Sequence, residues 1–263
     1  LSPFAPPPSA PSPQRTAPIS VVIGALGSIQ NAIFPALAAA FGTGIGNSGV
    51  WIGLAVGAVA VLIGTGFAYA GWLRTTYTIG EAVPKEGRWP VKLARALRAE
   101  GVPLADPHIL AQTGWTTDEL DAAIDDAEPF FDEYDFASLL IGVNNQYRGR
   151  SVEEYREQFG GLLERAIGFT QGRRERVLVL SIPDWGVTAF GQQDARGMAG
   201  IAAEIDTFNA AAQDICRQRG VAFVDITGVS RTLGEQAAMQ AADGLHPSAL
   251  MYAEWTRLAL PYA

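Results

Sequence analysis

Asp243 and His246 stand three residues apart, with Gly244 between them, shortly before the last helical pattern of the chain. A carboxylate at this spacing can hold one nitrogen of an imidazole and leave the other nitrogen free to take a proton. His246 is one of only two histidines in the sequence, the other being His108. The pattern indicates a general base with its orienting carboxylate, although a polar turn before a helix would also use these residues.

Two further residues could stabilise negative charge. Gly114 follows one short apolar run, and Asn144 follows another. A glycine leaves its backbone N–H open to a ligand, and an amide side chain is a second neutral donor, which together suit a developing oxyanion. Taken singly, Gly114 would also fit a turn, Asn144 a helix cap and His246 the surface. Their occurrence at successive strand ends favours a catalytic site.

The elements that must position these residues alternate along the chain, which predicts parallel strands joined by crossover helices. Ser151, with Glu154 three residues later, has the spacing of a helix-capping box, and Ser248 is expected to cap the last helix. Apolar runs predict strands at 108–112, 136–143, 177–182 and 221–226, and helical periodicity predicts helices at 90–98, 117–126, 151–167, 195–219 and 248–260.

This alternation predicts an α/β fold, a doubly wound three-layer α/β/α sandwich with a mostly parallel five-stranded sheet. The site would then lie at the carboxyl ends of the strands. A fifth strand should come directly before Tyr77, and the candidate for it is the apolar segment near 67–73.

The residues before this domain form a different kind of sequence. Residues 1–19 are rich in Pro, Ser and Ala and predict a disordered tail. Residues 20–73 form an apolar extension without Asp, Glu, Lys, Arg or His, in two runs, about 20–42 and 49–73. Each run is long enough to cross a bilayer as a helix, which takes roughly 20 apolar residues.

A transmembrane hairpin that anchors the protein to a membrane is therefore the leading interpretation of residues 20–73. Arg15 and Arg74 flank it and are too few to assign a side of the membrane. The alternative is that these Gly- and Ala-rich runs are buried segments of a core, or a mistranslated upstream sequence. The hairpin and the expected strand at 67–73 compete for the same residues.

The charge and the metal-ligand types exclude several functions. All 27 acidic residues but only 18 of the 19 basic ones lie from Arg74 onward, and an acidic domain without a basic stripe argues against nucleic acid as a partner. The two histidines lack companions at metal-ligand spacing, so no metal is expected, and no Gly-rich phosphate loop points to a nucleotide cofactor. Cys216, the single cysteine, falls in a helical pattern and is expected in the core.

From about Tyr77 to Ala263 the chain resembles the SGNH, or GDSL-type, hydrolases, a family of esterases and lipases. The resemblance rests on four blocks in order and on the segment 181–187. The blocks are Tyr77-Thr-Ile-Gly-Glu-Ala-Val-Pro84 with Arg88-Trp-Pro90, then Gly114, then Gly142-Val-Asn144, and then Asp243-Gly-Leu-His246-Pro247.

The resemblance implies hydrolysis of a small-molecule ester, of acyl-ester, acetyl-ester or lysophospholipid type, through a catalytic triad. It assigns His246 as the base and Asp243 as its orienting residue. The Gly114 N–H and the Asn144 side chain would form the oxyanion hole together with the nucleophile's own N–H. No cofactor is implied.

One block departs from the family pattern. Gly-Asp-Ser should stand immediately before Tyr77, and this chain has Arg74-Thr75-Thr76. The nucleophile position, which also contributes to the oxyanion hole, therefore falls on Thr76. Threonine keeps a hydroxyl, but its methyl group restricts χ1 and crowds a site shaped for serine.

Three explanations for the departure remain open: a fusion or shifted reading frame upstream, an inactive relative that keeps a ligand pocket, or slow hydrolysis through Thr76. Two functions follow from them. The first is an ester hydrolase, impaired by the missing serine, and the alternative is an inactive ligand-binding module tethered to a membrane.

Overall fold

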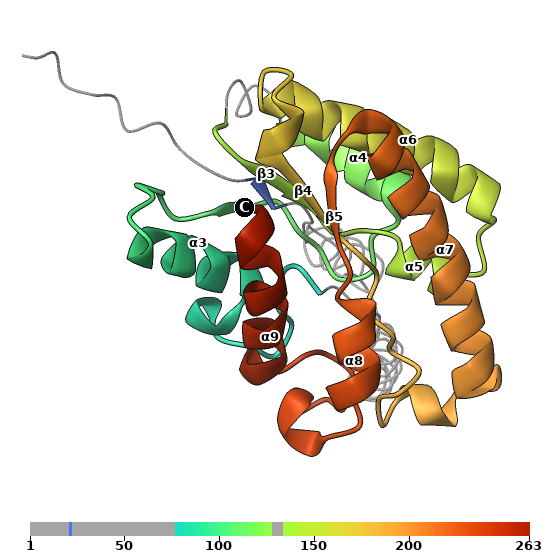
Figure 1. Ribbon diagram of the computed structural model, residues 1–263. Helices are drawn as coiled ribbons and strands as arrows, with labels where there is room; N and C mark the ends of the chain where they lie inside the picture. The colour runs from blue at the N-terminus through green and yellow to red at the C-terminus, as the bar shows by residue number, and fades with distance from the viewer. Residues whose placement is uncertain (1–20, 23–76, 128–133) are drawn as a thin grey trace, which may run out of the picture.

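A five-stranded parallel sheet forms the centre of the computed structural model, which describes residues 21–22, 77–127 and 134–263. The strand order is β2-β1-β3-β4-β5, and every neighbouring pair is parallel (Figure 1). The strands are β1 (Val21–Val22), β2 (His108–Ile109), β3 (Ala137–Leu139), β4 (Val177–Leu180) and β5 (Ala222–Val224). This is the flavodoxin-like doubly wound order, and it confirms the predicted α/β fold.

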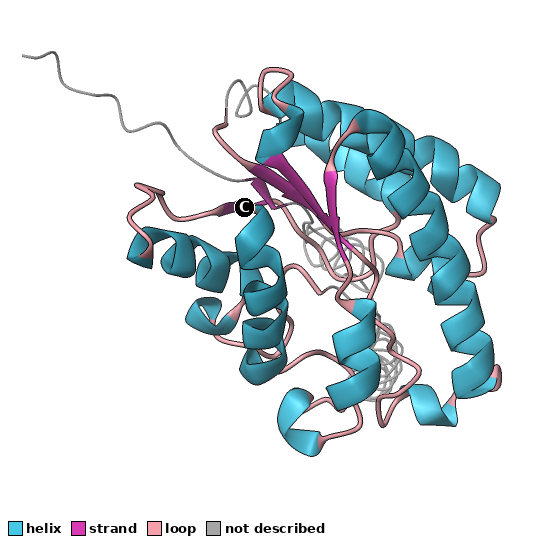
Figure 2. Ribbon diagram, in the orientation of Figure 1, coloured by secondary structure: helices cyan, strands magenta, loops and turns pink. Residues whose placement is uncertain are grey.

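Helices cover both faces of the sheet, and Figure 1 shows the three layers. The helices α3 (Trp89–Ala99) and α9 (Ala249–Ala259) pack against each other on one side, and α4 (Thr117–Ala127), α6 (Val152–Phe169) and α7 (Gly197–Arg219) lie on the other. Two short helices, α5 (Val143–Tyr147) and α8 (Thr227–Leu233), follow β3 and β5 directly (Figure 2).

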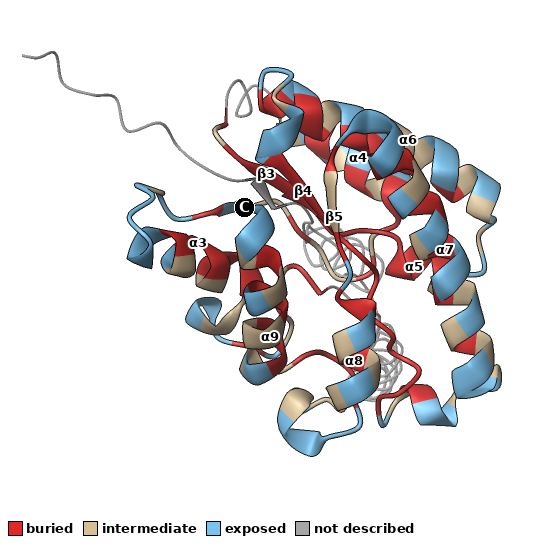
Figure 3. Ribbon diagram, viewed as in Figure 1, coloured by how far each residue is buried: buried red, intermediate tan, exposed pale blue. Residues whose placement is uncertain are grey.

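The central strands are buried because both faces of the sheet are covered. Every residue of β3 and β4 is buried (Figure 3). Trp89 of α3 and Trp255 of α9 are fully buried on one side of the sheet, and Tyr155 and Phe159 of α6 on the other. The core therefore lies on both sides of the sheet and holds fixed the strand ends from which the site is built.

The observed helix caps match the sequence. The Ser151 hydroxyl accepts the backbone N–H of Glu154 at 3.1 Å, and Ser248 accepts the N–H groups of Leu250 and Met251 at the start of α9. The Glu154 carboxylate binds Arg150 instead of completing the capping box. Both serines end a loop and start a helix, so they fix the chain on either side of the site.

The strands are shorter than predicted. The predicted strand 136–143 is observed only at Ala137–Leu139. It could not have extended to residue 143, because Gly142 has a φ of +122°, which an extended strand does not allow, and α5 begins directly after it. The helix predicted at 195–219 begins at Gly197.

The strand between β2 and β3 is Val21–Val22, at the opposite end of the apolar extension from the predicted segment. That segment, 67–73, lies outside the described residues, as do the tail 1–19 and the rest of the candidate transmembrane hairpin 20–73. Among the helices that the structure does describe, none is both long and apolar enough to cross a bilayer.

Candidate active site

The Asp243 carboxylate makes three hydrogen bonds within the turn of residues 243–246, two of them with His246. Its Oδ2 lies 2.6 Å from Nδ1 of the His246 ring, and its Oδ1 accepts the backbone N–H groups of Leu245 (3.0 Å) and His246 (2.9 Å). Gly244 makes this turn possible, because its φ of +69° is costly for a residue with a Cβ. The carboxylate therefore sets both the backbone turn and the orientation of the ring.

Opposing effects act on the pKa of Asp243. Burial acts to raise the pKa of this carboxyl, but the hydrogen bond and charge of the His246 ring and the two backbone N–H groups lower it to about 2. Asp243 is therefore ionised at neutral pH and stabilises a protonated imidazole.

The His246 ring is buried, with 1% of its surface exposed. Its Nε2 has no hydrogen-bond partner among the residues that the structure describes. Tyr77 stacks edge-on against the ring, with 6.1 Å between the ring centroids. A small cavity of about 20 Å³ adjoins both rings, and Trp185, Met251 and Trp255 also line it. The free nitrogen thus faces an interior that excludes bulk water.

Tyr77 stays neutral in this position. Burial, above all, and the nearby Tyr252, Asp184 and Asp243 raise the pKa of its phenol well above the ordinary value. Thr76, the predicted nucleophile position, lies outside the described residues. Its neighbour Tyr77 contacts the His246 ring, and the roles of Thr76 and His246 remain predictions.

Gly114 and Asn144 lie together at the same edge of the sheet. Asn144 stands in the first turn of α5, is buried, and donates from Nδ2 to the carbonyl of Trp115 at 2.9 Å. Gly142 starts that helix with a left-handed φ, and a Cβ there would lie 2.5 Å from the Tyr155 ring. Glycine is therefore required at position 142, in the connection between β3 and Asn144.

The loop after β4 contacts both α5 and the cavity beside His246. Trp185 donates from Nε1 to the Gln146 amide of α5 at 2.8 Å, and its ring lines the cavity beside His246. The loops after β2, β3 and β4 thus meet at one edge of the sheet, at the carboxyl ends of the strands, where ligands bind in open α/β sheets. The structure therefore brings the Asp243–His246 pair, Gly114 and Asn144 to the same edge of the sheet.

The sequence profile of the GDSL-like lipase/acylhydrolase family matches residues 70–254. The chain belongs to this family. It is a family of lipases and acylhydrolases, which implies small-molecule ester substrates. No curated protein sequence matches the chain.

Several solved structures share the fold of this family member. A lipase/acylhydrolase from Enterococcus faecalis is 18% identical, with a TM-score of 0.51, over 64% of this chain and 80% of the other. TesA is 17% identical, with a TM-score of 0.53, over 72% and 94%. Axe2, an acetylxylan esterase from Geobacillus stearothermophilus, is 17% identical, with a TM-score of 0.50, over 66% and 80%. At these identities the similarity shows the fold alone.

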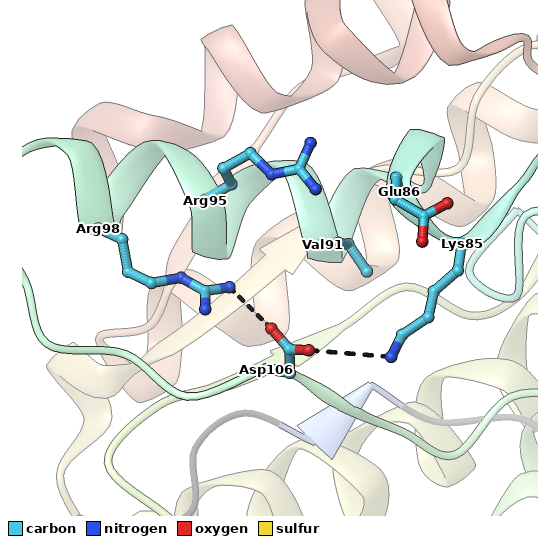
Figure 4. Close-up of a pocket in the computed structure, with 6 residues that line it drawn as sticks. All are labelled: Lys85, Glu86, Val91, Arg95, Arg98 and Asp106. Atoms are coloured by element: carbon cyan, nitrogen blue, oxygen red, sulfur yellow. Dashed lines mark hydrogen bonds and ion pairs between the residues drawn. The ribbon is translucent and has the colours of Figure 1, made fainter.

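A larger cavity of about 310 Å³ lies beside α3 (Figure 4). Three of its charged side chains are paired, because Asp106 binds Arg98 at 3.0 Å and Lys85 at 3.8 Å. None of the predicted site residues lines this cavity, so we do not assign the reaction to it.

The remaining candidate residues lie elsewhere. In the described part of the chain, no three His, Cys, Asp or Glu side chains come together as a metal site. His108 sits at the edge strand β2, where its ring nitrogen lies 3.1 Å from the Tyr134 hydroxyl. Cys216 is buried in α7, and burial raises the pKa of its thiol to about 12, which identifies a core thiol.

Sequence reasoning overlooked two groups near the site. Asp184 is a buried carboxylate that binds the Arg231 guanidinium at 2.7 Å and the N–H of Gly186 at 2.9 Å, and it fixes the loop after β4. Arg148 donates to the carbonyl of Gly114 at 2.6 Å. The spacing of four residues between Asn144 and Arg148 was the available signal, since it places both on one helical face.

Proposed function

We propose that this family member hydrolyses small acyl esters by nucleophilic catalysis, with the hydroxyl of Thr76 in the place of the family serine. The observation that carries the proposal is the buried Asp243–His246 pair, whose Nε2 is left for a proton beside the first block. Gly114 and Asn144 at the same sheet edge supply donors of the kind that an oxyanion needs.

The first half of the reaction forms an acyl-enzyme. His246 takes the proton from the attacking hydroxyl at Nε2 while the oxygen adds to the ester carbonyl carbon. The resulting oxyanion accepts hydrogen bonds from the Gly114 N–H, the Asn144 amide and the N–H at position 76. His246 then gives its proton to the alcohol as the carbon–oxygen bond to that alcohol breaks.

The second half releases the acid. His246 deprotonates a water molecule, which adds to the acyl carbon, and the bond to the position-76 oxygen breaks as that oxygen takes the proton back. Asp243 remains ionised throughout and stabilises the imidazolium. The threonine methyl group slows both halves, because it limits the rotamers from which the oxygen can attack.

The test is turnover of p-nitrophenyl acetate by the purified chain. His246→Ala and Asn144→Ala are each expected to remove at least about a hundredfold of the rate, the cost of losing one oxyanion donor or more. His108→Ala, which removes the other histidine from an edge strand, is the matched control and should leave the rate unchanged. Unchanged turnover in either site variant would contradict the mechanism.

One sequence feature favours a second candidate, an inactive ligand-binding module held at a membrane through residues 20–73. This feature is the replacement of the family Gly-Asp-Ser by Arg74-Thr75-Thr76. Under this proposal the chain shows no turnover, and Thr76→Ser alone restores none. Turnover gained by the triple change Arg74→Gly, Thr75→Asp and Thr76→Ser, and absent from the single change, would identify a hydrolase that has lost its nucleophile.

A further inference from the structure

The short helix α5 and Arg148, the residue that directly follows it, bind the turn that carries Gly114 at two consecutive carbonyl groups. Asn144 donates from Nδ2 to the Trp115 carbonyl at 2.9 Å, and Arg148 donates from Nη2 to the Gly114 carbonyl at 2.6 Å. The two side chains are four residues apart, so they project from the same face of the helix.

Asn145 of α5 makes further contacts, with the start of α4. Asn145 is fully buried, and its amide is hydrogen-bonded to Thr117 twice, from Nδ2 to Oγ1 at 2.7 Å and from the Thr117 N–H to Oδ1 at 3.1 Å. Arg148 also pairs with Glu119 of α4, with 3.1 Å between Nη1 and Oε1. The Gly114–Thr117 turn is thus attached at successive points to the helix that carries Asn144.

We propose that Arg148 is a positioning residue that holds the Gly114 N–H in line with the Asn144 amide. This inference rests on the proposed function, in which both groups bind the oxyanion. Gly114 has a φ of +97° and no side chain to restrict it, so its peptide groups need an external anchor. A charge-assisted hydrogen bond to its carbonyl supplies one, because such bonds are about twice as strong as neutral ones.

The anchor acts through geometry more than through its charge. Glu119 neutralises the guanidinium, and Arg148 reaches the Gly114 carbonyl rather than the N–H that would face the substrate. A displacement of about 1 Å at a catalytic group costs up to about a hundredfold in rate. Loss of Arg148 is therefore expected to lower kcat by about ten- to a hundredfold, with KM changed less than about twofold.

Arg150 is a matched control within the same structure. It lies two residues further along, pairs with Asp118 of α4 and Glu154 of α6 at 2.8 Å each, and is similarly exposed. Within the described part of the chain, none of the hydrogen bonds of the Arg150 side chain reaches Gly114 or Trp115. Arg148→Met and Arg150→Met thus remove equal charge and comparable ion pairs, but only the first removes the contact with the turn.

The kinetic arm compares kcat and KM for p-nitrophenyl acetate in Arg148→Met, Arg148→Lys and Arg150→Met, each checked for an unchanged melting temperature. The first should lose kcat, lysine should recover part of it through one N–H donor, and Arg150→Met should stay within about twofold of the parent. Equal losses in both methionine variants, or no loss in Arg148→Met, would overturn the proposal.

A second arm does not depend on catalysis. It measures how well the turn is held, by amide hydrogen exchange of the peptides that contain Gly114 and Trp115. Exchange should speed up at least about tenfold in Arg148→Met and remain at the parent rate in Arg150→Met. Unchanged exchange in Arg148→Met overturns the proposal. If the parent chain hydrolyses nothing, the proposed function fails, and this arm still decides whether Arg148 positions the turn.

Discussion

The Asp243 carboxylate binds both the side chain and the backbone of His246, with 2.6 Å from Oδ2 to Nδ1 and 2.9 Å from Oδ1 to the backbone N–H. The two contacts come from different oxygens of one carboxylate. The ring and the turn that carries it are therefore fixed by the same group, and a change at Asp243 affects the proton affinity of the base and its position together.

Asp243→Asn is expected to lower kcat/KM for p-nitrophenyl acetate by about 10³–10⁴-fold. An amide at this position favours the wrong imidazole tautomer and no longer stabilises the imidazolium. Asp135→Asn, at a half-exposed carboxylate paired with Arg173, is the control and should keep the parent rate. A loss of less than tenfold in Asp243→Asn would show that His246 does not act as the base.

The lowered pKa of Asp243 predicts a loss of stability in acid. The folded-state pKa of about 2 lies below the ordinary 3.8, so this carboxylate stabilises the fold above pH 4 and ceases to do so as the pH falls toward 2. After allowance for solvent screening at a partly exposed group, the contribution is about 1–2 kcal/mol.

Urea unfolding at pH 7, 4 and 3 measures this contribution. The free energy of unfolding of the parent should fall more steeply below pH 4 than that of Asp243→Asn, because the variant has no carboxyl to titrate at position 243. Parallel curves for the two proteins would show that the Asp243–His246 contact is not formed in the folded chain.

Gly142→Ala should destabilise the fold by about 3 kcal/mol, because a Cβ would lie 2.5 Å from the Tyr155 ring at a φ of +122°. Gly149→Ala is the control, since its φ is +67° and nothing lies within 4 Å of the added Cβ. It should cost only about 1 kcal/mol. Chemical denaturation compares the two, and equal losses would rule out the packing effect.

Part of the site could be predicted because its geometry is local or follows from topology. Asp243 and His246 meet within one turn, for which a glycine at the second position is sufficient. Gly114 and Asn144 follow separate strands, and parallel strands bring their carboxyl ends to one edge. The fold class followed from the alternation of apolar runs with helical periodicity.

The parts that escaped prediction are short. The helices α5 and α8 have five and seven residues. Both are shorter than two full helical turns, so their sequences are too short to show a 3.6-residue periodicity. The contact between Arg148 and Gly114 joins residues 34 positions apart, and its one signal in the sequence is the spacing of four residues between Asn144 and Arg148. Strand β1 has only two residues within a long uncharged run, where nothing marks a boundary.

That strand leads to a last prediction. In sequence, β1 continues as Val21-Val22-Ile23-Gly24, which has the form of a strand entering a Gly-Asp-Ser block. Deletion of residues 25–74, combined with Thr75→Asp and Thr76→Ser, would join Gly24 to Asp-Ser-Tyr77. We expect this variant to keep the melting temperature of the parent and to hydrolyse p-nitrophenyl acetate faster than Thr76→Ser does.

The same deletion with alanine at position 76 is the control and should be inactive. A joined variant that fails to fold would show that β1 does not feed the first block. If it folds and hydrolyses the ester, the two parts of the catalytic motif are separated along the sequence rather than lost: the glycine is Gly24, two residues after β1, and the rest of the first block begins at Tyr77, which contacts His246.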